Sequence, residues 1–587
     1  MTVKGGRVGV WPLLVFWALA AAAFAAKAWF AAPTTPLILD SDDAMRLTEV
    51  HDFLGGQGWF DLVQHRLNTP YGASMHWSRL VDLPEAALLF LLRPFAGEAA
   101  DTILIYLWPT LLLGPLLWLT AKLALRLGRR EAVWPALILP SLSLITLGEF
   151  VPGRLDHHSA QILLSLAILY CTIAALERPR FAIGAALAAA AALAIGIEGL
   201  PIVAVTAVVF ALMWVADERH ADAMRDFGLA FACAMALALA QGVAPDDWLL
   251  LRIDAISVVY VVAAILCGSA FTALSLLPLP RRPLRLIAAS ATGAVVAALL
   301  LWLDPSILKG PYAALDPWLV QNWLSHISEA QSWAQSFAED PLYPLAVTVP
   351  VLVALVYASW NVVRHPNDRV AWLIVVAFLL VGVLVMLIQI RAGRIVTPLA
   401  VAPTAALVAT AWRRLVARPG IVPALAAVGS VLVSAGLVVA IVVALVPLPT
   451  QPGSGPRGDR RACLQPEAFA SLAKLSPQRL MAPIDLGSHL LLFTPHAVVA
   501  APYHRNQQGL LDTLHFFNGP IEDGRAILAA RSISLVVVCP AMSELRGTIE
   551  HAPDSFVSLF TDGRLPDWLV PQSAPSAVLQ VYAVKPR

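Results

Sequence analysis

Long apolar runs recur along the whole chain of 587 residues, and they constrain its fold more than any other feature. A helix needs about 20 mostly apolar residues to cross a bilayer. The runs that approach this length are residues 10–32, 101–125, 132–147, 161–175, 182–195, 200–215, 227–243, 256–277, 284–303, 343–363, 370–388, 395–412 and 422–446. Lipid offers no hydrogen-bond partners to a backbone, so each run should be helical. The sequence therefore predicts a mostly α, polytopic membrane protein with about thirteen transmembrane helices.

The composition agrees with a chain that has lipid as its main solvent. Hydrophobic residues make up 59% of the chain and charged residues only 13%, and the mean hydropathy is +0.73. A soluble chain of this length would carry roughly 25% charged residues. The first run, 10–32, is longer than the roughly 7–15 apolar residues of a signal peptide, which predicts an uncleaved first span. The net charge of +1 gives no reason to expect a nucleic-acid partner.

Lysine and arginine collect in alternate loops, which sets the orientation because cytoplasmic loops are enriched in them. These residues are Lys4 and Arg7; Arg126, Arg129 and Arg130; Arg178 and Arg180; Arg219 and Arg225; Arg281, Arg282 and Arg285; Arg364 and Arg369; Arg413, Arg414 and Arg418. We therefore expect a protein of the bacterial inner membrane with a cytoplasmic N-terminus. An odd number of spans then places the C-terminal part in the periplasm.

Two domains follow from this topology. Residues 1–450 would form the membrane domain, with a first periplasmic loop at 33–84 and a long periplasmic loop at 304–342. Residues 451–587 alternate helical stretches (466–475, 507–517, 523–530) with β-type runs (496–499, 534–538, 578–584), which predicts a small soluble α/β periplasmic domain. Cys463 and Cys539 fall in this part and could form a disulfide in an oxidising compartment; pairing and two free thiols both remain open.

Charged residues near a membrane usually mark function, and the first group follows the first span. Asp40, Asp42 and Asp43 place three carboxylates within four residues, where they repel one another unless a cation or an arginine neutralises them. A hard divalent metal does this through oxygen ligands. The alternative is a solvated acidic turn that caps a helix.

Two further outside loops carry candidate ligands. Asp156 and His158 are two residues apart, so only an extended turn would direct both side chains to one side. Such a turn could present a carboxylate oxygen and an imidazole nitrogen to one metal; a helix cap is the alternative. Glu329 lies in the long loop at 304–342, where an ordinary loop carboxylate is the alternative to a role in the site.

Arg391 and Arg394 lie at an outside membrane edge, against the usual distribution of positive charge. A guanidinium group matches phosphate oxygens in a bidentate geometry, so a phosphate is one explanation. An ion pair with an outside carboxylate is the other.

The order and spacing of these groups resemble the catalytic subunit of oligosaccharyltransferases, a GT-C membrane glycosyltransferase. Asp42-Asp43 resembles the first acidic motif of that family, and Gly153-Arg154-Leu155-Asp156-His157-His158 is similar to the Gly-x-x-Asp-His-His motif of its archaeal members. The segment 326–331, His-Ile-Ser-Glu-Ala-Gln, resembles a Ser-Val-Ser-Glu-His-Gln loop motif. The acidic pair also resembles those of protein O-mannosyltransferases and aminoarabinose transferases, which use polyprenyl monophosphate sugars.

The resemblance implies inverting, metal-assisted transfer of a sugar or oligosaccharide from a polyprenyl-(pyro)phosphate donor to a periplasmic acceptor, in contact with membrane lipid. Asp43, Asp156, His158 and Glu329 would hold Mn²⁺ or Mg²⁺. Catalysis would fall to Asp42, Asp43 and Glu329, with Asp42 or Asp43 as the base and Asp40 as a less favoured substitute. Arg391 and Arg394 would bind the donor phosphate.

The acceptor region departs from the family. Of the Trp-Trp-Asp motif expected near residue 485, only Asp485 and a nearby glycine remain, so the acceptor, a protein, lipid or glycan, is open. Tyr503, His504 and Arg505 could take over acceptor binding, and Glu198 could face the pocket. A lipid or polysaccharide transporter, a flippase or a cell-envelope polymer ligase is the alternative. Transporters tend to show internal repeats and mid-helix charges, whereas the charges here lie in outside loops.

Overall fold

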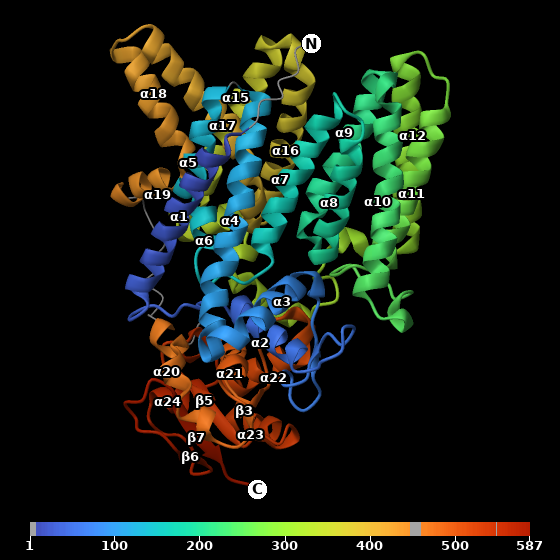
Figure 1. Cartoon of the computed structure of the whole chain (residues 1–587). Helices are drawn as coiled ribbons and strands as arrows, with labels where there is room; N and C mark the ends of the chain where they lie inside the picture. The colour runs from blue at the N-terminus through green and yellow to red at the C-terminus, as the bar shows by residue number, and fades with distance from the viewer. Residues whose placement is uncertain (1–7, 129, 447–459, 547–548, 587) are drawn as a thin grey trace.

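The computed structural model describes residues 8–128, 130–446, 460–546 and 549–586. A bundle of long helices forms one end of the molecule, and a C-terminal region with a small sheet forms the other (Figure 1). The helices α2 (Ser41–Leu54) and α3 (Arg79–Ala96) lie between the two. Lys4, Arg7, Arg129 and the predicted boundary at residue 450 fall outside the described residues.

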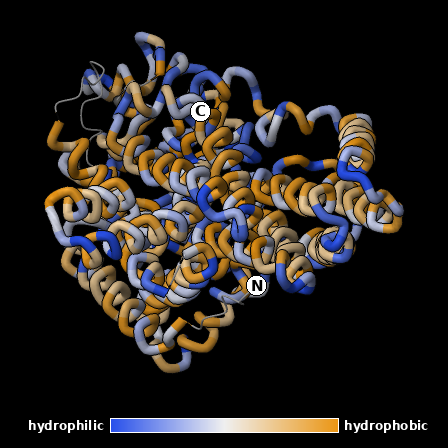
Figure 2. Tube along the Cα trace, turned by 90° about the horizontal axis from the view of Figure 1, so that it is seen from above, coloured by the Kyte–Doolittle hydropathy of each residue, from blue (hydrophilic) through white to orange (hydrophobic). Residues whose placement is uncertain are grey.

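Within the described ranges, ten helices are long and apolar enough to cross a membrane. They contain α1 (Val10–Ala31), α4 (Ala100–Leu127), α7 (His158–Ala175), α9 (Leu200–Ala216), α10 (Ala221–Gly242), α11 (Val258–Leu276), α12 (Arg282–Leu303), α15 (Leu342–Arg364), α16 (Arg369–Ile388) and α17 (Gly393–Ala417). Hydrophobic residues predominate along the helices in Figure 2. The prediction of a mostly α, multi-pass membrane protein is confirmed.

The other three predicted spans are helical but irregular. Helix α8 (Phe181–Ile195) has 15 residues, so at 1.5 Å per residue it is shorter than the roughly 30 Å hydrocarbon core. The run 132–147 is divided between α5 (Val133–Ile138) and α6 (Leu144–Glu149), because Pro140 between them lacks a backbone N–H. Helices α18 (Ile421–Ser434) and α19 (Gly436–Leu445) meet at an angle of 92°. By length and composition the described residues thus give ten spans, or eleven with the bent pair, rather than thirteen.

The C-terminal region contains a five-stranded mixed sheet in the order β4-β3-β5-β7-β6. Its strands are β3 (Arg479–Met481), β4 (Ala497–Val498), β5 (Leu535–Val538), β6 (Leu569–Pro571) and β7 (Gln580–Val584). The central strand β5 is buried along its whole length, as its run of leucine and valine predicts. The predicted runs contain β4, β5 and β7, whereas β3 and β6 were missed because three residues show no periodicity.

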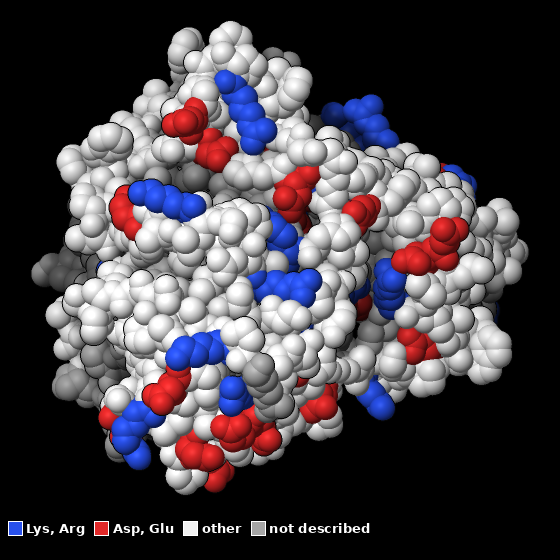
Figure 3. Space-filling view, turned by 90° about the horizontal axis from the view of Figure 1, so that it is seen from below, with Lys and Arg blue, Asp and Glu red and all other residues white. Residues whose placement is uncertain are grey.

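Short helices surround the sheet and line the loops. They are α13 (Pro317–Asn322), α14 (Trp333–Glu339), α20 (Pro466–Phe469), α21 (Ile484–Phe493), α22 (Gln507–Asn518), α23 (Ile521–Ala530) and α24 (Phe556–Thr561). The predicted helices at 507–517 and 523–530 correspond to α22 and α23. Seen from below, this end of the molecule carries acidic and basic side chains close together, so it presents no single sign of charge (Figure 3).

The first loop and the C-terminal region share one hydrophobic core. Met45 and Trp77 pack in the same cluster as Leu480, Leu486 and Tyr503. Backbone hydrogen bonds also join the two, because the N–H of Val498 donates to the carbonyl of residue 66 (2.8 Å) and the N–H of residue 69 donates to the carbonyl of Val498 (3.1 Å). The start of α2 is therefore fixed by residues more than 400 positions away in the sequence.

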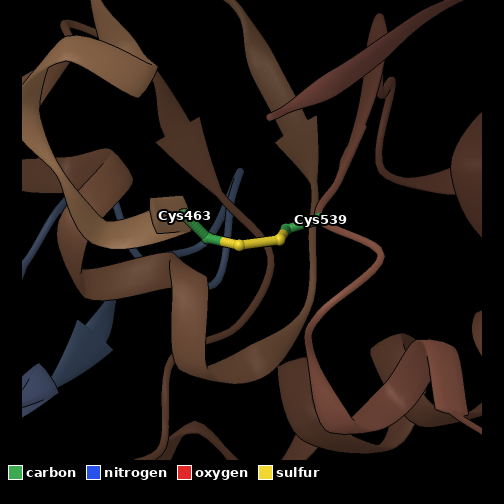
Figure 4. The surroundings of a disulfide bond; sticks show 2 residues. All are labelled: Cys463 and Cys539. Atoms are coloured by element: carbon green, nitrogen blue, oxygen red, sulfur yellow. A yellow bond between two sulfur atoms is a disulfide. The ribbon is translucent and has the colours of Figure 1, made fainter. Parts of the chain in front are cut away.

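A disulfide joins Cys463 to Cys539, and their Cα atoms are 6.2 Å apart (Figure 4). Both cysteines are buried. The bond ties the segment before α20 to the end of β5 and closes a loop with a sequence separation of 76 residues. Of the two outcomes that the sequence left open, the structure has the paired one.

Candidate functional site

The N-terminus of α2 anchors the site. Asp40 caps the helix, because its side chain accepts a hydrogen bond from the backbone N–H of Asp42 (3.1 Å). Asp43 is buried, and both of its carboxylate oxygens accept hydrogen bonds. Its Oδ1 accepts from the backbone N–H groups of Leu155 (2.7 Å) and Asp156 (2.8 Å), and its Oδ2 accepts from Arg154 Nη1 (2.8 Å). Asp43 therefore fastens α2 to the loop that carries the Asp-His-His motif.

Asp42 is in a different situation from its neighbour. No side-chain hydrogen bond or ion pair joins its carboxylate to another residue of the described ranges. Burial and the carboxylates of Asp40, Asp156 and Glu329 raise the pKa of Asp42 well above its usual range. Asp42 thus faces the other acidic groups of the site and keeps its lone pairs free.

The Asp-His-His loop turns at Gly153, which has a φ of +102°. A Cβ at this position would lie 2.0 Å from the carbonyl oxygen of Leu37, so no other residue fits without a rearrangement. The turn directs Asp156 and His158 to the same place, with Asp156 Oδ2 3.1 Å from His158 Nε2. His157 joins them, because its Nδ1 lies 2.5 Å from Asp156 Oδ1.

These three residues fit a metal ion. One ligand atom from each lies within 4.8 Å of the others. Asp156 Oδ2 is buried and takes part in no hydrogen bond within the described ranges. His158 Nε2 lies 2.5 Å from Arg394 Nη1, which can only donate, and in the neutral ring with its proton on Nδ1 this nitrogen has the lone pair that a metal ligand needs. The other ring nitrogen, Nδ1, lies 3.3 Å from Glu198 Oε2, which is a typical partner of a metal-binding histidine.

Arginine side chains enclose this acidic centre. Arg394 Nη2 lies 2.5 Å from Glu329 Oε2, and its Nε lies 3.2 Å from Glu149 Oε1. Arg391 Nη1 donates to the Tyr312 hydroxyl (3.2 Å) and lies 3.7 Å from Glu198 Oε1. The structure thus brings Glu329 to the site through Arg394.

Sequence reasoning gave no role to Arg154 or Glu149. Arg154 Nη1 donates to Asp40 (2.9 Å) as well as to Asp43, and its Nη2 donates to Glu149 Oε2 (3.1 Å). Glu149 therefore lies between Arg154 and Arg394. The sequence does place an acid and an arginine, five residues apart, just before the Asp-His-His motif. It cannot show which acids the arginine will pair with.

A further group of buried charged residues contacts Asp156. Arg46 is fully buried and is paired with Asp82, and its guanidinium stacks over Trp77 at 4.3 Å. Its Nη2 lies 3.9 Å from Asp156 Oδ1. Arg79 also donates to Asp82 (2.9 Å). These contacts hold α2 and α3 together directly behind Asp156.

A cavity of about 280 Å³ opens in front of His158. One part of its wall is polar and includes His157, His158, Glu198, Arg391 and Arg394. The lining also includes aliphatic side chains, namely Ile162, Ile195, Ile197, Leu200, Pro201, Ile202, Val385, Ile395 and Val396. The cavity is therefore amphipathic, because cationic and aliphatic side chains both line it.

The predicted acceptor residues are dispersed. His504 lines the cavity, and Arg505 lies behind it against Asp254 (Nε to Oδ2, 2.6 Å). The Tyr503 hydroxyl donates to the carbonyl of Ser41 at the start of α2 (3.1 Å). Asp485 is paired with Arg460 (2.6 Å) and is not among the residues that line the cavity. The structure brings Glu198, Tyr503 and His504 to the site but not Asp485.

No protein-family model matches the sequence, and no curated protein matches it either. Solved structures do match, and they show that the chain shares the fold of an archaeal oligosaccharyltransferase. The oligosaccharyltransferase of Archaeoglobus fulgidus in its apo form has a TM-score of 0.67 and 12% identity, with 98% of this chain and 74% of that chain covered. The oligosaccharyltransferase AglB of Archaeoglobus fulgidus, in complex with an inhibitory peptide and a dolichol-phosphate, gives a TM-score of 0.64 at 11% identity, with 98% and 74% covered. The complex of the first of these enzymes with Zn and sulfate gives a TM-score of 0.63 at 12% identity, with 98% and 73% covered. The resemblance to oligosaccharyltransferases is confirmed at the level of the fold.

Proposed function

We propose that this chain is a membrane glycosyltransferase that moves a sugar from a polyprenyl-phosphate donor to an acceptor outside the cytoplasm. The amphipathic cavity carries the proposal. Its aliphatic side chains suit a polyprenyl chain, and Arg391 and Arg394 suit a phosphate. His158 also lines the cavity, and Asp156 Oδ2 lies 3.1 Å from its Nε2. Asp42 is near enough to Asp156 for the charge of Asp156 to raise the pKa of Asp42.

The roles of the residues follow from their contacts. The acceptor attacks the anomeric carbon, the bond from that carbon to the phosphate oxygen breaks, and the phosphate keeps the electron pair. Arg394 and Arg391 stabilise the negative charge on the leaving phosphate. Asp42 takes the acceptor's proton, because its lone pairs are free, whereas those of Asp43 are engaged with Arg154 and the backbone. A single displacement of this kind inverts the anomeric centre.

Asp156 and His158 would hold a divalent cation, with Asp42 beside them. Such a cation would supply positive charge to the departing phosphate. A mixed carboxylate and imidazole set suits Mn²⁺ as well as Mg²⁺. Glu329 pairs with Arg394 and would orient that guanidinium rather than bind the metal. Asp43 would be a structural residue rather than a ligand.

The fold and the disulfide support a periplasmic site. Disulfides persist in oxidising compartments and are rare in the cytosol, so the Cys463–Cys539 bond favours placing the C-terminal region in the periplasm of a bacterial cell. The site lies at the junction with that region, and the N-terminus would then be cytoplasmic. We keep residues 1–450 and 451–587 as the two domains, although the first loop contributes to the core of the second.

The ligands seen with archaeal enzymes of similar fold support this proposal. One has been seen with a dolichol-phosphate and an inhibitory peptide, and one with Zn and sulfate. A lipid phosphate, a metal ion and a peptide are thus ligands of proteins with this fold. A protein acceptor is one candidate here, and a lipid or glycan acceptor is the other.

Transfer of label tests the function directly. Purified protein in lipid nanodiscs is given polyprenyl phosphates that carry radiolabelled sugars, together with bacterial membrane extract. We expect label to move from the lipid to an acceptor, to stop after EDTA treatment and to return with Mn²⁺ or Mg²⁺. A second measurement is the rise in melting temperature on adding Mn²⁺, which the double variant Asp156→Asn, His158→Ala should lose. Movement of intact labelled lipid across the bilayer of sealed proteoliposomes, without transfer, would instead identify a flippase.

Tyr503→Phe should slow the reaction without weakening donor binding. The phenol hydroxyl holds the carbonyl of Ser41, next to Asp42, so its loss loosens the position of the base. One lost hydrogen bond costs about 1 kcal/mol, so we expect kcat to fall by about 5-fold and KM for the donor to stay within twofold. Steady-state kinetics with the labelled donor measure both values. An increase in KM at unchanged kcat would contradict the positioning role.

A further inference from the structure

A second polar wall of the cavity is formed by residues other than the two arginines. His504 comes from the C-terminal region and Asp254 from the segment between α10 and α11, and His504 Nε2 lies 2.8 Å from Asp254 Oδ2. Arg505 holds the same carboxylate with two bonds, from Nε to Oδ2 (2.6 Å) and from Nη2 to Oδ1 (3.0 Å). The His504 ring contacts His76 at 4.7 Å between centroids and meets Tyr312 edge-on at 5.5 Å. His76, Asp254, Tyr312 and His504 all line the cavity.

The hydrogen-bonding state of this wall can be worked out from its partners. Burial raises the pKa of Asp254, but hydrogen bonds from His504 and Arg505 outweigh burial and hold it well below its usual range, so the carboxylate is ionised. An ionised carboxylate only accepts, so His504 Nε2 donates and, in the neutral ring, Nδ1 accepts. No residue of the described ranges bonds to His504 Nδ1. The Tyr312 hydroxyl accepts from Arg391, so its own proton is free to donate.

His76 adds an unused group to the same wall. Its Nδ1 is buried and has no hydrogen-bond partner within the described ranges. The wall therefore offers an imidazole acceptor, a phenol donor and an unpartnered ring nitrogen. A hydroxyl group both donates and accepts, so several hydroxyls on one ligand match this set better than an anion does. The charge of Arg505 is already used by Asp254, which also disfavours a second phosphate here.

Arg391, a proposed phosphate ligand, contacts this wall through Tyr312. Arg391 donates to Tyr312 and its guanidinium lies 5.7 Å from the centre of the Tyr312 ring. A group covalently attached to a phosphate at Arg391 would thus come to lie next to Tyr312 and His504. In a lipid-linked donor that group is the sugar.

We propose that His504, held by Asp254, forms with Tyr312 and His76 the subsite that recognises the hydroxyl groups of the donor sugar. The C-terminal region thereby contributes to the choice of donor as well as to the architecture. This inference rests on the proposed function, since it assumes a lipid-linked sugar in the cavity. It assigns substrate selection to residues that make no contact with Asp42 or His158 in the interactions described above.

The test compares a bare lipid phosphate with the same lipid carrying a sugar. Farnesyl phosphate and farnesyl phosphate bearing glucose, mannose or arabinose are titrated into the full-length protein in detergent, for the wild type, His504→Ala, His504→Gln and the control His551→Ala. His551 is exposed in the same region, bonds only within its own turn and does not line the cavity. The melting temperature of each variant is recorded to verify folding.

We expect at least one sugar-bearing lipid to bind the wild type about 5- to 10-fold more tightly than farnesyl phosphate, as one or two hydrogen bonds would give. His504→Ala should abolish that preference and leave binding of farnesyl phosphate within twofold. His504→Gln, whose amide can donate to Asp254 and still accept, should restore part of it, and His551→Ala should match the wild type.

Three results would overturn the subsite. They are a wild type without preference for any sugar, a preference that survives His504→Ala, and equal weakening of both ligands in a folded His504→Ala variant. The failure of the proposed function would look different, because the wild type would then not bind farnesyl phosphate at all.

Discussion

Arg394→Ala is expected to lower kcat/KM for the lipid-linked donor by about 100- to 1,000-fold, as the loss of one group that stabilises transition-state charge does. Arg394 enters the cavity from the first turn of α17 and contacts Glu329, Glu149 and His158. In the proposed reaction, its charge stabilises the leaving phosphate. Transfer of labelled sugar, measured over a range of donor concentrations, gives the change.

Stability separates a chemical role of Arg394 from a structural one. Glu149 keeps a partner in Arg154 when Arg394 is removed (3.1 Å), so the fold should survive the substitution. Arg394→Lys keeps the positive charge but loses the bidentate guanidinium. Its activity should therefore lie between that of the wild type and that of Arg394→Ala. Arg414→Ala, an exposed site in the last turn of the same helix, is the matched control and should behave as the wild type. Activity near the wild-type value in Arg394→Ala would remove the phosphate-binding role.

The adjacent acids Asp42 and Asp43 should respond to the same substitution in opposite ways. Asp42→Asn is expected to lower kcat by about 100- to 10,000-fold, the usual contribution of a general base. Its melting temperature should stay constant or rise slightly, because asparagine removes the cost of burying an ionisable carboxyl group beside other acids.

Asp43→Asn should act on stability first. The substitution leaves Arg154 without one of its acceptors in a buried place, and breaking a buried ion pair costs about 3–5 kcal/mol. Part of this is offset here, because Asp40 and Glu149 still accept from Arg154. We expect the melting temperature of Asp43→Asn to be clearly below that of Asp42→Asn. Thermal unfolding in detergent, monitored by intrinsic tryptophan fluorescence, measures both. Normal stability in Asp43→Asn combined with complete loss of transfer would make Asp43 the base.

The different roles of Asp42 and Asp43 could not be predicted from the sequence. The string Asp-Ser-Asp-Asp predicts an acidic site but not the part each acid takes, because neighbours on a helix point about 100° apart and either could face the cavity. The 153–158 loop decides the matter, since its N–H groups and Arg154 bond to Asp43 and not to Asp42. Glu329 is similar, because the motif locates it near the site but its contact with Arg394 depends on how the long loop folds.

The spans illustrate the same point at a larger scale. Hydropathy predicts every apolar segment, because the cost of exposing backbone to lipid is local to each segment. It does not predict that α8 is short or that α18 and α19 meet at 92°, because those features depend on packing against neighbouring helices.

The sequence by itself determined the membrane class, the helical segments and the nearness of Asp156 to His158, because each depends on residues within one turn or one apolar run. Only the tertiary structure decided which acid stays free, where the arginines point, and that His504 meets Asp254 across 250 positions of sequence. The physical reason is that hydrogen bonds and ion pairs act over a few ångströms. They therefore depend on which distant segments the packed helices and the shared core bring together, and no local pattern encodes that.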